Sequence, residues 1–68
     1  MKGYLSMLKS LREHRKISQE RLAFDIGIET STLSRWENGS RTPSFHNFLC
    51  WISALNCKLV IYPNGTQE

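Results

Sequence analysis

Apolar residues recur with helical spacing through most of this chain, and a short continuous apolar run follows near its end. In the first segment one apolar stripe consists of Tyr4, Leu5, Leu8 and Leu11. Apolar residues on one face with polar residues between them indicate amphipathic helices that pack together. The predicted elements are a helix over 2–14, two short helices within 18–39, a helix over 45–55 and a strand over 58–62.

The two central helices are predicted to meet at a sharp turn. Ser18 can cap the first of them, and Gly27 can end it in the left-handed conformation. In the second helix Leu33 and Trp36 lie three residues apart on an inward face. The remaining outer face is polar and consists of Thr30, Ser31, Ser34, Arg35 and Asn38. A helix-turn-helix with such an outer face has the form of a reader of the DNA major groove, and the alternative is an ordinary helical hairpin with a solvated face.

Several short motifs follow one another through this region. They are Ser18-Gln19, Leu22-Ala23, Gly27-Ile28, Ser31-Thr32, Leu33-Ser34-Arg35, Trp36-Glu37-Asn38-Gly39 and Arg41-Thr42-Pro43. In this combination they resemble the Cro/C1-type (XRE-like) family of bacterial and phage DNA-binding regulators, from about Leu8 to Leu55. The resemblance implies an all-α fold, a small four-helix helix-turn-helix (lambda-repressor-like) domain that binds double-stranded DNA.

The resemblance also implies roles for individual residues. The base-reading positions are Thr30, Ser31 and Arg35, with Ser34 beside them, and the phosphate contacts are Gln19, Asn38 and Arg41. It pairs Arg12 with Glu37 as an architectural ion pair, whereas the alternative is that Arg12 reaches solvent past its neighbours. Glu29 departs from the family pattern, which more often has a short capping residue there. Its carboxylate reads a base, hinders phosphate binding or only complements the helix dipole.

The C-terminal run raises the question of a partner. A lone strand over 58–62 leaves backbone groups unpaired, so we expect it to pair with the same strand of a second copy. That pairing would bury either Leu59 and Ile61 or Val60 and Tyr62 against the fourth helices of a homodimer. The alternative is a short extended tail on its own helices. The layout resembles HipB-like antitoxins, which implies a toxin as a further candidate partner.

The predicted fourth helix carries two further candidates. Its apolar arc consists of Phe45, Phe48, Leu49, Ile52 and Leu55. Trp51 falls at the flank of this arc and is either a contact with another subunit or a partly buried core residue. His46 and Cys50 share a face four residues apart, which is a weak signal for metal binding or thiol chemistry. We therefore expect no enzyme activity, no metal and no cofactor.

Composition and charge add limits to this interpretation. Sixty-eight residues allow one small domain, 1–68, near the lower limit for independent stability. The net charge of +3, with six of the nine basic residues between Lys2 and Arg21, is compatible with phosphate binding. Two cysteines form no disulfide framework, and no signal peptide or membrane span is present, so we expect a cytoplasmic, nucleoid-associated protein. The predicted function is a dimeric repressor on a palindromic operator; the alternative is a protein-interaction module with secondary DNA binding.

Overall fold

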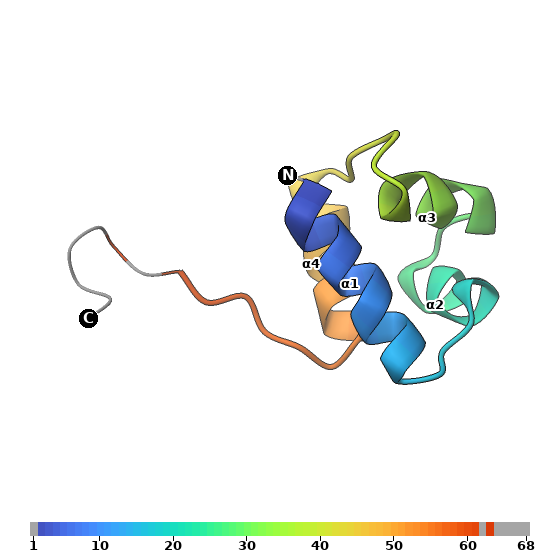
Figure 1. Cartoon of the computed structure of the whole chain (residues 1–68), viewed down its shortest axis with the longest axis horizontal. Helices are drawn as coiled ribbons and strands as arrows, with labels where there is room; N and C mark the ends of the chain where they lie inside the picture. Colours follow the sequence, from blue (N-terminus) through green and yellow to red (C-terminus); the bar gives the residue numbers. More distant parts are fainter. Residues whose placement is uncertain (1, 62, 64–68) are drawn as a thin grey trace.

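Four helices make up the fold in the computed structural model, which describes residues 2–61 and 63 (Figure 1). They are α1 (Lys2–His14), α2 (Gln19–Ile26), α3 (Thr30–Glu37) and α4 (Phe45–Ala54). The all-α, four-helix prediction is thus confirmed. In the described ranges no helix has the length and apolar character needed to span a membrane.

Local capping residues fix where the short helices begin and end. The Ser18 hydroxyl accepts a hydrogen bond from the Arg21 N–H at 3.0 Å, and Ser44 caps α4 in the same way. Gly27 ends α2 with a φ of 89°, a left-handed value at which a side chain would be strained. Its N–H donates to the carbonyl oxygen of Ala23 at 2.9 Å. These caps hold the turn between α2 and α3 to residues 27–29.

One apolar core joins all four helices. Its fully buried side chains come from α1, α2, α3, α4 and the residue after α4; the largest are Leu5, Leu22, Leu33, Trp51 and Leu55. The rings of Trp36 and Trp51 lie with their centroids 5.7 Å apart, so α3 and α4 meet through two indoles. α2 packs on both α3 and α4, and α1 packs on α3. This arrangement leaves the opposite face of α3 at the surface.

The buried face of α4 differs from the predicted one. Trp51, the candidate subunit contact, is 0% exposed and lies in the core, whereas Phe45 is 65% and Leu49 is 40% exposed. The buried arc is centred on Trp51, Ile52 and Leu55, the side that meets the other helices. The prediction of Trp51 as an interface residue is therefore wrong, and its alternative as a core residue holds. Seven of the ten residues of α4 are apolar, so spacing alone did not define one face.

The C-terminal segment forms no strand in the part of the chain that the structure describes. Residues 58–61 run in an extended path away from the helices, without a paired neighbour (Figure 1). The physical reason is that a strand needs a second strand to satisfy its backbone groups, and the described residues of one copy contain none. Tyr62, the last residue of the predicted strand, lies outside the described residues.

Candidate nucleic-acid interface

α3 presents one side to the core and the other to solvent. Leu33 and Trp36 are 0% and 4% exposed, and they fix the inward side. The four predicted base-reading residues lie on the remaining arc, with Ser31 and Arg35 exposed and Thr30 and Ser34 half-buried. At about 100° per residue, these four positions span roughly 140° of the helix surface. The structure therefore brings all four together on one polar face.

Arg35 lies in the last turn of this face with its side chain exposed. Among the described residues it has no ion-pair partner, so its guanidinium is available for an external acceptor. Its carbonyl oxygen accepts hydrogen bonds from the N–H groups of Ser40 at 3.0 Å and Arg41 at 3.2 Å. The loop after α3 consequently turns back over the helix end and keeps Arg41 close to Arg35.

Asn38 helps to shape the same loop. It ends α3, and its side-chain oxygen Oδ1 accepts a hydrogen bond from the N–H of Ser40 at 2.9 Å. The amide nitrogen of Asn38 remains available as a donor, because only the oxygen is used. Both Asn38 and Arg41 are exposed at the C-terminal end of α3, where a positive side chain is also favoured by the helix dipole. Two of the three predicted phosphate contacts thus lie beside the predicted base-reading residues.

Arg12 and Glu37 form a buried ion pair between α1 and α3. The Arg12 Nε donates to Glu37 Oε2 at 2.7 Å, and its Nη2 donates to Glu37 Oε1 at 3.1 Å. The third nitrogen, Nη1, donates to the Ile17 carbonyl oxygen at 2.7 Å. Arg12 and Glu37 are 7% and 6% exposed, so the alternative in which Arg12 reaches solvent does not describe this structure. A bidentate pair with a third bond satisfies most of the buried charge.

Gln19, the third predicted phosphate contact, belongs to this network. Its Nε2 donates to Glu37 Oε1 at 2.9 Å, which ties the first residue of α2 to the last residue of α3. An amide nitrogen carries two hydrogens, so one donor remains for a phosphate oxygen. The positioning role of Gln19 was missed from the sequence, because no local spacing signals a bond between residues 18 positions apart.

Glu29 stands at the entry of α3. It occupies the N-cap position, is exposed, and makes no side-chain capping hydrogen bond. It directly precedes Thr30 and Ser31, the first two of the predicted base-reading residues. A negative charge here is favourable for the helix dipole and unfavourable for phosphate. The carboxylate is therefore accessible at the entry of α3.

The cysteine and histidine residues do not form a second site. The Cys50 Sγ lies 3.8 Å from His46 Nε2 on the outer side of α4. Within residues 2–61 and 63, no group of three potential ligands contains this pair. Cys57 is half-buried at the start of the C-terminal segment, where its Sγ contacts the Leu55 carbonyl oxygen at 3.5 Å.

Two short helices joined by a three-residue turn, with a polar outer face on the second, define a helix-turn-helix DNA-binding domain. The sequence agrees with this class, since residues 8–61 match the helix-turn-helix family HTH_3, and the chain belongs to this Cro/C1-type (XRE) family. It is accordingly a DNA-binding transcriptional regulator of a non-enzymatic family. No curated protein and no solved structure matches the chain.

Proposed function

We propose that this protein is a sequence-specific transcriptional repressor that acts in the cytoplasm as a homodimer on a palindromic operator. The observation that carries the proposal is the polar face of α3, which lies away from the buried Leu33 and Trp36 and keeps Arg35 exposed and without an ion-pair partner in the described residues. An α-helix fits the major groove of B-DNA, where each base pair presents a distinct hydrogen-bonding pattern. A dimer bound across a promoter would block transcription by occlusion.

Arg35 is the main reader in this proposal. A guanidinium can donate two hydrogen bonds to O6 and N7 of guanine, which discriminates by about 1 to 3 kcal/mol against the wrong base. The hydroxyls of Thr30, Ser31 and Ser34 discriminate less, since each can donate or accept. They complete the contact surface around the arginine.

The phosphate contacts hold the helix in register. Asn38 and Arg41 flank the C-terminal end of α3, and Gln19 begins α2. Contacts to phosphate oxygens orient the protein on the duplex and carry no direct sequence information. The bond from Gln19 to Glu37 supports this role, because it fixes the amide relative to the recognition helix.

A matched pair of charge deletions tests the assignment. We expect Arg35→Ala to relax base preference at one position in each half-site, measured by selection from a random duplex library. We expect Arg41→Ala to weaken binding to all sequences alike and to lower the salt slope of log K by about one. Both variants remove one exposed arginine, so each controls for the loss of charge. Unchanged preference profiles in both would show that α3 is not the reader.

The second candidate is a protein-interaction module in which DNA binding is secondary, including an antitoxin that holds a toxin. One observation favours it, namely the exposed apolar side chains of α4 and the C-terminal segment, such as Phe45 and Ile61. The ratio of affinities for its own upstream DNA and for random duplex separates the two candidates. A repressor requires a ratio of about 10³ or more at physiological salt, whereas an interaction module does not.

A further inference from the structure

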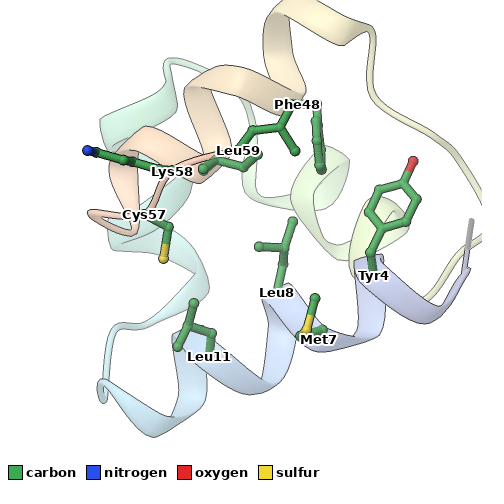
Figure 2. Close-up of a pocket in the computed structure, with 9 residues that line it drawn as sticks. Tyr4, Met7, Leu8, Leu11, Phe48, Cys57, Lys58 and Leu59 are labelled. Carbon is green, nitrogen blue, oxygen red and sulfur yellow. The ribbon is translucent and has the colours of Figure 1, made fainter. Parts of the chain in front are cut away.

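An apolar groove lies on the surface between α1, α4 and the C-terminal segment. Its volume is about 480 Å³, and its lining comes mainly from apolar side chains of all three elements (Figure 2). Tyr4 and Phe48 close one end with their rings edge to face, 5.2 Å between centroids. Met7, on the rim, is 62% exposed. A hollow of this composition is unfavourable in water, because apolar surface on both walls stays hydrated.

The C-terminal segment runs past this groove. Leu59 contributes its side chain to the lining and is 43% exposed, whereas Val60 and Ile61 are 60% and 78% exposed. In an extended chain, alternate side chains point to the same face, so Ile61 faces the same way as Leu59. It lies about 6.6 to 6.8 Å farther along the chain. In a paired strand its side chain would therefore point to the same side as Leu59, whereas in this structure Ile61 does not line the groove of its own copy.

We propose that the groove is the seat for Ile61 of a second copy of this chain. The proposal rests on the homodimer of the proposed function and specifies its contact. In a twofold antiparallel pair, directly opposite residues share a face, so residue 61 of one copy can lie opposite residue 59 of the other. Because Leu59 lines the groove, an Ile61 placed beside it enters the groove of the partner. Because of the twofold symmetry, the contact of Ile61 with the partner's groove occurs twice in the dimer.

The proposed pairing of residue 59 with residue 61 also determines where the twofold axis passes. Pro63 has no N–H to donate to a ladder, so the paired stretch ends before it. Opposite residues numbered 59 and 61 require the twofold axis to pass at Val60. Among the described residues, this register places residue 59 opposite residue 61 and Val60 opposite Val60 of the second copy. This register buries Leu59 with Ile61 and excludes the alternative in which Val60 and Tyr62 face the helices.

A second copy fits better than the chain's own tail. In this structure Ile61 is 78% exposed and does not line the groove, and residues 58–61 lead away from the helices (Figure 1), so the groove is not filled by the Ile61 of its own copy. On α4 the buried Ile52 lines the groove, and the exposed Leu49 and Phe45 follow it at spacings of three and four residues, so the apolar surface extends from the groove along the helix. That continuity enlarges the apolar surface toward the roughly 800 Å² per partner of a stable interface.

Two matched substitutions test the seat. Ile61→Thr and Val60→Thr both keep a β-branched residue, so strand propensity is nearly the same in the two variants. We expect Ile61→Thr to weaken the dimer about 10-fold per groove, hence about 100-fold in the dissociation constant measured by sedimentation equilibrium. We expect Val60→Thr to weaken it less than about fivefold. Equal effects, or a larger effect of Val60→Thr, would overturn the proposal.

The same variants distinguish the other occupants. If Ile61 filled the groove of its own copy, Ile61→Thr would lower the stability of the dilute monomer and leave the dissociation constant unchanged, which contradicts the proposal. If the dimer persists in Ile61→Thr and operator binding is unaltered, the proposed contact of Ile61 with the groove is refuted, and the proposed repressor function is not. If the wild-type chain stays monomeric yet selects a specific DNA sequence, both the Ile61 contact and the homodimer are refuted, and the proposed DNA-reading role is not.

Disulfide trapping tests the register directly. In full-length protein with Cys50→Ser and Cys57→Ser, a single Val60→Cys places two thiols opposite each other at the axis, within the Cα separation that a disulfide allows. An added oxidant, copper phenanthroline, accepts the two electrons as the S–S bond forms and two protons leave. We expect a linked dimer from Val60→Cys, and much less from Leu59→Cys or Ile61→Cys alone. Preferential linkage at 59 or 61, or none at 60, would overturn the register.

Discussion

The bond network around Glu37 offers the sharpest test of the fold. Glu37 accepts hydrogen bonds from two nitrogens of Arg12 and from the amide of Gln19, and its side chain is 2% exposed. Glu37→Gln removes the charge that compensates Arg12 while keeping the size of the side chain. Breaking a buried pair by removing one partner costs about 3 to 5 kcal/mol, since an uncompensated charge stays buried.

This loss is large compared with the whole domain. At about 0.05 to 0.15 kcal/mol per residue, the free energy of unfolding of 68 residues is roughly 3 to 10 kcal/mol. For a domain of this size each kcal/mol lowers the melting temperature by about 4 to 8 °C. We therefore expect Glu37→Gln to lower it by at least about 12 °C. Urea denaturation at fixed protomer concentration, followed by circular dichroism, gives the free energy itself.

An exposed ion pair provides the matched control. Arg21 Nε lies 3.2 Å from Asp25 Oδ2 on α2, and the Arg21 side chain is 71% exposed. Asp25→Asn makes the same chemical change as Glu37→Gln, from carboxylate to amide, in water. We expect it to cost less than about 0.5 kcal/mol. If Glu37→Gln cost no more than Asp25→Asn, the argument from buried charge would be refuted.

Three further substitutions test other parts of the structure. In Gly27→Ala the added Cβ meets no atom within 4 Å, but the backbone φ of 89° is strained for alanine. We therefore expect the free energy of unfolding, measured by urea denaturation, to fall by about 1 to 2 kcal/mol. An unchanged free energy of unfolding would mean that the turn relaxes. Glu29→Gln should raise affinity for random duplex about two- to threefold in a salt titration if its carboxylate repels phosphate, and unchanged affinity would leave only the dipole role. Trp51→Ala should lower the free energy of unfolding of the monomer by about 3 to 5 kcal/mol, and Phe45→Ala should lower it by less than about 0.5 kcal/mol. The reverse order would mean that Phe45, as the sequence predicted, belongs to the buried face of α4.

The sequence predicted the helix-turn-helix well because its signals are local. Ser18, Gly27 and Ser44 each act on backbone groups within a few residues, and the structure has the caps where they were expected. The polar face of α3 was also predictable, since Leu33 and Trp36 alone fix which side of an eight-residue helix turns inward. For such short elements a few residues determine both the ends and the orientation.

Other features depend on contacts between distant parts of the chain. In α4 apolar residues surround most of the helix, so only its packing against the other helices, including Trp36 of α3, selects Trp51 for the core and leaves Phe45 outside. The bond between Gln19 and Glu37 joins two helices, and neither residue's neighbours indicate it. The C-terminal segment is a third case, because the composition of a strand specifies the need for a partner but not where that partner is.

The buried network also connects stability to DNA reading. It joins α1, α2 and α3 through Arg12, Gln19 and Glu37, so it fixes the end of α3 relative to the start of α2. Replacing a buried pair by apolar residues is often neutral for stability, and we expect Arg12→Met with Glu37→Leu to recover more than half of the loss seen in Glu37→Gln. The Gln19 amide would then lack its partner.

That double variant separates two roles of the same bonds. If the network serves to orient the recognition helix, the double variant will be folded yet bind its selected operator less tightly, while its affinity for random duplex stays close to that of the unaltered protein. The reason is that specific contacts need a fixed angle between α2 and α3, whereas nonspecific binding depends mainly on charge. A folded double variant with an unchanged ratio of specific to nonspecific affinity would show that Gly27 and the apolar core suffice to set this angle.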